Sequence, residues 1–157
     1  MAGVSGFVRL RSSVNDADCA TALVDDGIPF DAATVTQVGQ LQGVSPLPSD
    51  QLVGTDVAKC GRTTQTTFGR VTAFDVDIAV QYDIGTLMFR GQLEMEGSDV
   101  RPFAAHGDSG SLVVTPDCMA AGLVFAVTSE GGANGKGLTY ANPIRTVLDL
   151  LNVDLIT

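Results

Sequence analysis

Hydrophobic and polar residues alternate along most of the chain after residue 53, which is the period of a β-strand with one buried face. This alternation predicts strands over residues 53–59, 69–82, 86–95, 111–115, 121–128 and 138–140. Its phase changes at Phe74-Asp75, which predicts a bulge or bend in the longest strand. Many short strands joined by glycine-rich turns are typical of an all-β sandwich or barrel.

The first 50 residues follow a less regular pattern. Strands are predicted over residues 6–10 and 35–41, and a small apolar segment follows Asp16 and Asp18. One interpretation is a helix that begins at Ala17 and is capped by one of these carboxylates. The alternative is that one of them is a buried carboxylate that orients an imidazole.

Two prolines mark the expected boundary between the arm and the main part of the chain. Pro46 and Pro48 predict an extended, exposed crossing. We therefore expect an N-terminal arm over residues 1–50 and a barrel with a terminal helix over residues 51–157.

The last segment has the spacing of an amphipathic helix. Its apolar residues fall on one face: Ile144, Val147, Leu148 and Leu151. Asn142 is the predicted N-cap, and Pro143 fits the first helical position. This helix should pack against the outside of the barrel.

Composition and charge exclude several classes of partner. The chain has 157 residues, enough for one domain, and a net charge of −9. This charge argues against binding to nucleic acid or to an anionic membrane, because both need clustered lysine and arginine. No apolar run is long enough for a membrane span, and residues 1–6 lack the pattern of a signal peptide.

The chain offers no pattern for a metal or cofactor. The three cysteines, Cys19, Cys60 and Cys118, match no zinc spacing, and His106 is the only histidine. We expect buried free thiols, with a Cys60–Cys118 disulfide as the alternative. The glycine-rich segment 130–137 is followed by a predicted strand instead of a helix, so we interpret it as a surface loop and not as a phosphate cradle.

The stretch Gly107-Asp108-Ser109-Gly110 is the candidate for chemistry. The two glycines permit a sharp bend that exposes Ser109 and aims the N–H groups of Gly107 and Ser109 at one point. Two convergent donors are what the oxyanion of an attacked carbonyl requires. The alternative is a polar hairpin turn that leads into the next strand.

Further motifs in a fixed order accompany this stretch, and together they resemble a known family. They are Val57-x-Lys59-x-Gly61-Arg62-Thr63-Thr64, Gly69-x-Val71, Ser111-Leu112-Val113-Val114, Gly122-Leu123-Val124-Phe125-Ala126 and Ala141-Asn142-Pro143-Ile144. From Val53 to the C-terminus the chain resembles bacterial chymotrypsin-like serine peptidases. The resemblance implies an antiparallel Greek-key β-barrel, mainly the C-terminal barrel of that family, with one C-terminal helix.

The resemblance also implies roles for particular residues. Ser109 matches the nucleophile, the N–H groups of Gly107 and Ser109 match the oxyanion hole, and Asp18 resembles the triad aspartate, with Asp16 as the weaker candidate. Phe125-Ala126-Val127 resembles the edge strand that pairs with substrate backbone.

Phe103 and His106, which both precede Ser109 in the chain, are expected to shape the substrate site. Phe103 falls where the family places the floor of the specificity pocket, which implies a small or apolar side chain in the substrate. His106 is expected to line the cleft, with its ring toward that pocket or toward solvent.

The sequence departs from the family pattern at three places. The triad histidine should precede the aspartate, but no histidine precedes Asp18, and His106 lies on the serine loop itself. Gln65 stands where the family has a glycine. Asp108, which pairs with a freed N-terminus in many relatives, has no partner that the sequence identifies.

These observations leave competing functions. The first is a serine endopeptidase-like domain that is inactive alone and needs an N-terminal segment to supply the histidine. The second is a non-catalytic module whose cleft binds an extended peptide or a partner protein. An unrelated β-sandwich is the third.

The sequence also carries expectations about assembly and compartment. We expect association into a homo-oligomer through an apolar face that a missing first barrel would leave exposed. The family implies a bacterial, secreted parent, but this chain has no export signal, so its compartment stays open.

Overall fold

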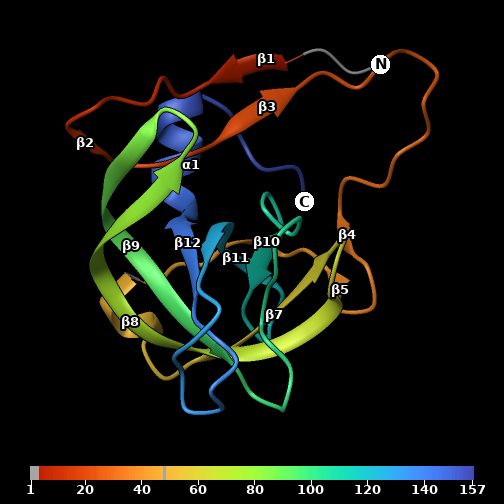
Figure 1. Cartoon of the computed structure of the whole chain (residues 1–157). Coiled ribbons are helices and arrows are strands. Elements are labelled where there is room, and N and C mark those ends of the chain that lie inside the picture. Colours follow the sequence, from red (N-terminus) through yellow and green to blue (C-terminus); the bar gives the residue numbers. More distant parts are fainter. Residues whose placement is uncertain (1–3, 48) are drawn as a thin grey trace.

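The structure, a computed structural model, describes residues 4–47 and 49–157, and it contains a closed antiparallel barrel (Figure 1). Its strands are β7 (Asp56–Gly61), β8 (Gln65–Tyr82), β9 (Gly85–Gly97), β10 (Leu112–Val114), β11 (Met119–Val127) and β12 (Thr139–Pro143). They pair in the order β10-β7-β8-β9-β12-β11, and the barrel closes because β10 also pairs with β11. The prediction of an all-β antiparallel barrel is confirmed.

The barrel interior contains the inward-facing apolar residues of these strands. The buried cluster includes Val57, Val71, Leu93, Met95, Val113, Val124 and Ala141 of the strands, together with Phe103 of the loop before β10. Removing these side chains from water is the main favourable contribution to folding. The alternation that predicted the strands is therefore the pattern that fills the core.

Strands β8 and β9 are the longest strands of the barrel, and their hairpin projects beyond the other strands at the upper left of Figure 1. Asp83 and Ile84 form the turn between these two strands. The predicted bulge is confirmed, because the β8–β9 register shifts between Val71 and Ile78 and Asp75 has a φ of 53°.

In its described part, the N-terminal arm contains six short strands and a 3-10 turn. These are β1 (Val4–Phe7), β2 (Val14–Asn15), β3 (Ala20–Ala22), β4 (Thr34–Val35), β5 (Gly39–Gln40), β6 (Gly43–Val44) and η1 (Ser49–Leu52). Strand β2 pairs in parallel with β9, and β6 pairs in parallel with β11, so both join the barrel sheet. Strands β1 and β3 form a separate two-stranded sheet, at the top of Figure 1.

Two predictions for the arm are wrong. The residues after Asp16 are extended instead of helical, because β2 binds the backbone of β9 and the side chain of Asn15 donates to the carbonyl of Met88. The strand predicted over residues 35–41 is a hairpin of β4 and β5, whose turn includes Gln37 with a φ of 60°. Pro48 and residues 1–3 lie outside the described residues, and the domain boundary at residue 50 stays a prediction.

The predicted terminal helix is confirmed as α1 (Ile144–Leu151), and it packs on the outside of the barrel. Its cap is different from the prediction: the N-cap is Pro143, and no side chain caps the helix. Asn142 instead belongs to β12, where its fully buried amide donates to Gln92 Oε1. No helix in the described part of the chain is long and apolar enough to span a membrane.

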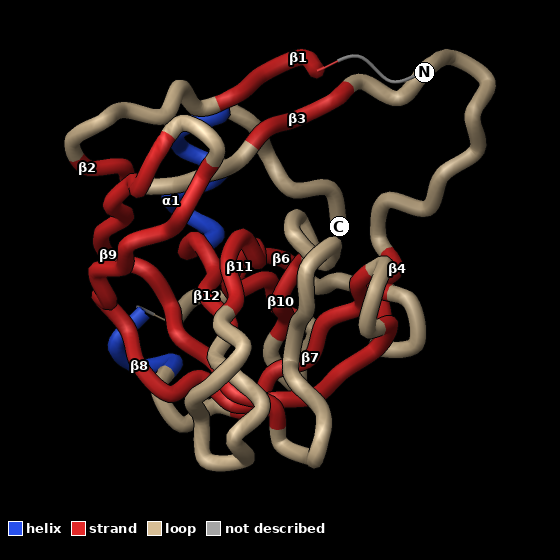
Figure 2. The backbone as a smooth tube through the Cα atoms, viewed as in Figure 1, coloured by secondary structure: helices blue, strands red, loops and turns tan. Residues whose placement is uncertain are grey.

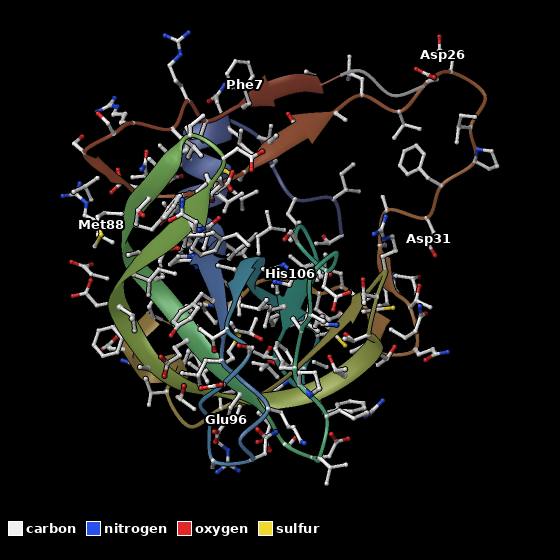
Figure 3. The ribbon with its side chains drawn as sticks, in the orientation of Figure 1. Phe7, Asp26, Asp31, Met88, Glu96 and His106 are labelled. Atoms are coloured by element: carbon white, nitrogen blue, oxygen red, sulfur yellow. The ribbon has the colours of Figure 1, made fainter. Side chains whose placement is uncertain are left out.

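Loops and the arm surround the barrel (Figure 2). The connection from β3 to β4 stands away from the rest of the chain, and Asp26 and Asp31 mark it in Figure 3. Phe7, Leu23, Ile28 and Phe30 of this arm are each more than half exposed. The arm therefore presents apolar side chains that the barrel does not cover.

Candidate active site

Ser109 lies on an exposed bend between β9 and β10. Gly107 and Gly110 have φ values of 98° and 88°, so the bend uses the left-handed backbone conformations that glycine permits. The N–H of Asp108 donates to the carbonyl of Ala105, and Ser111 Oγ donates to the carbonyl of Asp108. Ser109 Oγ lies 3.4 Å from the carbonyl oxygen of Phe125.

The N–H groups of Gly107 and Ser109 are the expected oxyanion donors. Within the described residues neither N–H donates to a protein acceptor, and both residues are exposed. A Cβ atom at position 107 would lie 2.5 Å from Thr63 Oγ1, so the loop is packed too closely there for any residue except glycine.

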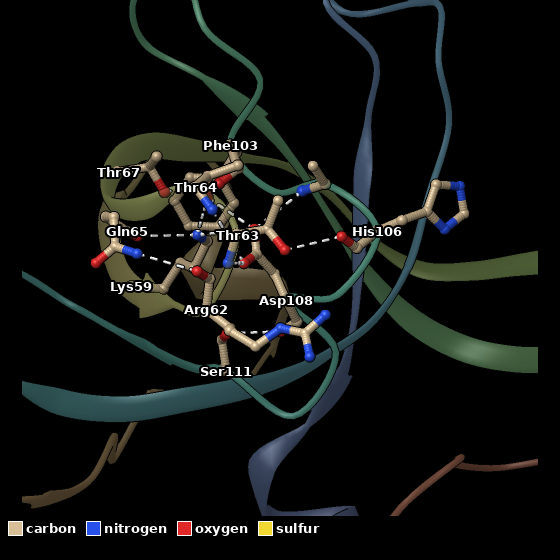
Figure 4. A network of polar contacts seen from close by, with 11 residues as sticks. Lys59, Arg62, Thr63, Thr64, Gln65, Thr67, Phe103, His106, Asp108 and Ser111 are labelled. Carbon is tan, nitrogen blue, oxygen red and sulfur yellow. Dashed lines mark hydrogen bonds and ion pairs between the residues drawn. The ribbon is translucent and has the colours of Figure 1, made fainter.

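The side chain of Asp108 is buried and is held by five contacts (Figure 4). Its Oδ2 accepts from Lys59 Nζ at 3.3 Å, from Thr64 Oγ1 at 2.7 Å and from the N–H of Ala105 at 3.0 Å. Its Oδ1 accepts from the N–H groups of Thr63 and Thr64 at 2.7 and 3.2 Å. Burial acts to raise the pKa of Asp108, but the hydrogen bonds from Thr64, Ala105 and Thr63 outweigh it and hold the pKa at about 2.

Lys59 supplies the partner that the sequence did not identify for Asp108. Both side chains are fully buried, so Asp108 is paired within the chain and needs no freed N-terminus. Lys59 Nζ also donates to Thr64 Oγ1 and to the carbonyl of Gln65. Gln65 has a φ of 56°, so the loop keeps a glycine-like conformation although glycine is absent.

His106 does not contact this network through its ring. Its carbonyl accepts from Thr63 Oγ1, whereas the imidazole is directed away from Asp108 (Figure 4). Among the described residues nothing forms a hydrogen bond or ion pair with that ring, and the residue is exposed. In the described part of the chain, no hydrogen bond joins the His106 imidazole to Ser109.

Asp18, the predicted triad aspartate, lies half-buried where the arm meets the β8–β9 hairpin. Its Oδ2 accepts from the hydroxyl of Tyr82 at 2.5 Å, and its N–H donates to Asn142 Oδ1 at 3.2 Å. Burial, and then the hydrogen bond and charge of Asp18, raise the pKa of the Tyr82 phenol. Asp16, the weaker candidate, forms an exposed ion pair with Arg90 at 2.7 Å.

Ser109 and Asp18 do not contact each other, but a row of aromatic rings connects them. The ring of Tyr82 lies 6.0 Å from that of Phe89, and the ring of Phe89 lies 5.0 Å from that of Phe125. The carbonyl of Phe125 is the group that Ser109 Oγ contacts. Each of the two candidate catalytic residues therefore contacts a member of one apolar cluster, Ser109 through Phe125 and Asp18 through Tyr82.

The segment Phe125-Ala126-Val127 ends β11 with one open edge. Ala126 pairs with Tyr140 of β12, and the N–H of Thr128 donates to the carbonyl of Leu138. Because hydrogen-bonded pairs alternate along an antiparallel ladder, the N–H and C=O of Val127 point to the other edge. Among the described strands none pairs with that edge beyond Leu123.

Phe103, the predicted floor of the specificity pocket, is buried in the barrel core. Its carbonyl accepts from Thr67 Oγ1 at 2.6 Å, and a Cβ atom at Gly69 would lie 2.6 Å from its ring. Its role in specificity stays a prediction.

Sequence reasoning missed four residues that hold this arrangement together: Lys59, Thr64, Tyr82 and Asn142. Lys59 carried a signal, because a lysine at an inward position of an apolar strand requires a buried partner. The link between Tyr82 and Asp18 had no signal, because it joins residues 64 positions apart.

The three cysteines were the remaining candidates for a disulfide or a metal site. All three cysteines are free, so the alternative of a Cys60–Cys118 disulfide is wrong. Cys19 is buried as expected, whereas Cys60 and Cys118 are only partly buried. In the described part of the chain, no group of three histidine, cysteine, aspartate or glutamate side chains could hold a metal ion.

Comparisons with known proteins agree with this fold. A family model described as the Nal1 C-terminal domain matches residues 18–157. No curated protein sequence matches the chain. Among solved structures, a chymotrypsin from Cellulomonas bogoriensis is 24% identical, with a TM-score of 0.70 over 99% of this chain and 75% of that one.

Other bacterial proteases give similar values. Protease A of Thermobifida fusca is 21% identical, with a TM-score of 0.71 over 99% of this chain and 74% of its own. A glutamic acid specific serine protease is 20% identical, with a TM-score of 0.66 over 99% of this chain and 73% of its own. At these identities the likeness establishes a chymotrypsin-like fold.

Proposed function

This chain belongs to the Nal1 C-terminal domain family, and we propose that it supplies the nucleophile and the oxyanion hole of a serine endopeptidase. The observation that carries this proposal is the bend at Ser109. It exposes the hydroxyl, leaves the N–H groups of Gly107 and Ser109 without protein acceptors, and is held by the buried Lys59–Asp108 pair.

In the proposed reaction an imidazole removes the proton from Ser109 Oγ while the oxygen attacks the carbonyl carbon of a peptide bond. The N–H groups of Gly107 and Ser109 stabilise the resulting oxyanion. The imidazolium then protonates the leaving amine as the C–N bond breaks, and water hydrolyses the acyl-enzyme by the same route. The open edge at Val127 would pair with the backbone of the substrate.

The chain does not itself supply this imidazole. The His106 ring is directed away from the network, and the raised pKa of Tyr82 makes its phenol a poor base at neutral pH. Without a base the expected acceleration is only on the order of 10³–10⁴ over water. We therefore propose that another polypeptide segment, bearing a histidine, docks on the arm, where Phe7, Leu23, Ile28 and Phe30 offer apolar contacts.

The test is reaction of the full chain with a fluorophosphonate probe that phosphonylates activated serines. The reaction is measured alone, with free imidazole, and with a histidine-bearing N-terminal segment of a two-barrel relative. Labelling at Ser109 that requires the added base, and that Ser109→Ala abolishes, supports the proposal. Absence of labelling under all three conditions contradicts it.

A second function is favoured by the open edge of β11, which exists whether or not a base is present. In this alternative the domain binds an extended peptide or a partner protein without cleaving it. Binding of extended peptides that is unchanged by Ser109→Ala, with no cleavage in the parent chain, would support it. Cleavage in the parent together with loss of binding in Ser109→Ala would contradict it.

A further inference from the structure

We infer that Tyr82 and Asn142 are positioning residues that fix Asp18 from two sides and leave one carboxylate oxygen open for the docking imidazole. This inference rests on the proposed function, because it assigns the residues that prepare the candidate triad carboxylate. It concerns residues from three separate parts of the chain: the arm, the tip of the β8–β9 hairpin and the end of β12.

The first support is the contact between Tyr82 and the carboxylate. The Tyr82 hydroxyl lies 2.5 Å from Asp18 Oδ2, and a hydroxyl that donates to a carboxylate forms a strong, charge-assisted bond. Within the described residues, no side chain or N–H donates to Asp18 Oδ1. One oxygen is thus held while the other can accept an N–H from an imidazole.

The second support is a pair of buried amides that holds the backbone at Asp18. Asn142 Nδ2 donates to Gln92 Oε1 at 2.6 Å, which leaves Asn142 Oδ1 to accept the N–H of Asp18. Gln92 Nε2 in turn donates to the carbonyl of Asp16 at 2.9 Å. Both amide side chains are fully buried, so their orientation is fixed by these partners.

The third support is the position of this network relative to Ser109. Tyr82 packs on Phe89, and Phe89 packs on Phe125, whose carbonyl contacts Ser109 Oγ. Holding Asp18 against Tyr82 therefore also fixes its position relative to the nucleophile. The docking imidazole must form hydrogen bonds with Asp18 and Ser109 at the same time. A fixed distance between these two residues therefore lowers the entropic cost of placing the imidazole.

The contact itself can be tested without any activity. Ring-labelled tyrosine NMR follows the titration of the only two tyrosines, Tyr82 and Tyr140, whose phenol pKa values are both raised, and Tyr140 donates to Glu94. Asp18→Asn should lower the pKa of Tyr82 and leave Tyr140 unchanged, whereas the matched control Glu94→Gln should lower only that of Tyr140. If Asp18→Asn leaves the Tyr82 titration unchanged, the inference is overturned whatever the activity.

The positioning role is tested by imidazole-dependent phosphonylation of Ser109. Tyr82→Phe keeps the ring and its packing but removes the donor, and the maximal rate at saturating imidazole should fall about tenfold. Tyr140→Phe, the matched control, should not change that rate. Asn142→Leu removes the oxygen that accepts the N–H of Asp18, so it should also lower this rate.

The outcomes separate the two proposals. If the parent chain reacts and Tyr82→Phe reacts at the same rate, this inference fails while the proposed function stands. If the parent chain never reacts, the proposed function fails, and the positioning role fails with it.

Discussion

Lys59 and Asp108 form a fully buried ion pair with 3.3 Å between Nζ and Oδ2, and this pair joins β7 to the loop that carries Ser109. The serine loop is therefore held by the barrel that it belongs to. The conformation of the candidate nucleophile does not depend on a charge brought from another segment.

Breaking this pair should strongly destabilise the fold. Lys59→Met leaves the Asp108 carboxylate buried without its counterion, and we expect the free energy of unfolding to fall by about 3–5 kcal/mol. Urea denaturation measures this change.

An exposed ion pair provides the control for that measurement. Arg70 and Asp56 are 3.2 Å apart, and both side chains are more than half exposed, so Arg70→Ala should cost less than about 1 kcal/mol. Equal effects of Lys59→Met and Arg70→Ala would contradict the importance of the buried pair.

The lowered pKa of Asp108 predicts acid sensitivity. Its folded-state pKa of about 2 lies below the value of about 3.9 expected in the unfolded chain. The stabilisation from this group is therefore complete above about pH 4 and is lost as the pH falls toward about 2. Carbon NMR of the Asp108 carboxyl group should give a midpoint near that folded-state value.

Two threonine variants separate the hydrogen bonds that set this pKa. Thr64→Val removes a hydroxyl donor to Asp108 and should raise its pKa, so acid destabilisation should begin at higher pH. Thr63→Val keeps the N–H that donates to Asp108 and removes only a bond to the carbonyl of His106. The same pKa shift in both variants would show that the Thr64 hydroxyl is not the determinant.

Gly107 and Gly110 form a matched pair for testing the oxyanion loop. Both have positive φ, but a Cβ atom at position 107 meets Thr63, whereas one at position 110 meets nothing within 4 Å. Gly107→Ala should lower the imidazole-dependent labelling of Ser109 by about 100-fold because it displaces an oxyanion donor. Gly110→Ala introduces backbone strain but no clash. An equal loss of Ser109 labelling in Gly110→Ala would therefore contradict the role of the Gly107 N–H as an oxyanion donor.

The cysteines should differ in reactivity. Burial, and then the charge of Asp18, raise the pKa of the Cys19 thiol, which lowers the fraction of reactive thiolate. Cys60 and Cys118 are only partly buried. A thiol reagent at neutral pH should modify Cys60 and Cys118 before Cys19, and peptide mass spectrometry identifies the modified residue. Modification of Cys19 first would contradict the prediction.

The exposed apolar residues of the arm predict self-association in the absence of a partner. Phe7, Leu23, Ile28 and Phe30 are each more than half exposed, and apolar patches of this kind drive assembly. Light scattering should detect a dimer or larger species, and serine at all four positions should yield a monomer. A clean monomer of the parent chain at high concentration would contradict the prediction.

The barrel could be predicted from the sequence because its strands bury one face each. Alternation located the β8–β9 hairpin, its turn at Asp83 and its bulge near Asp75, and it separated helix α1 from the strands. The arm could not be predicted in the same way. Its strands have two to four residues, and two of them, β2 and β6, are extended because β9 and β11, far away in the sequence, bind their backbones.

The candidate site was predicted unevenly for a similar reason. Gly107 and Gly110 are local signals, because the bend needs their positive φ values. The residues that hold the site act over long distances: Lys59 binds Asp108 across 49 positions, and Asn142 binds the backbone of Asp18 across 124. Asn142 looked like a helix cap because it precedes Pro143, but its amide satisfies buried groups instead.

The long β8–β9 hairpin also bears on the order in which the parts of the chain fold. A two-residue turn brings its strands together with little loss of chain entropy, so this hairpin can form early in folding. Asp18 reaches its position only through contacts 64 and 124 residues away, with Tyr82 and Asn142. We therefore expect the carboxylate end of the candidate site to assemble after the strands that receive it.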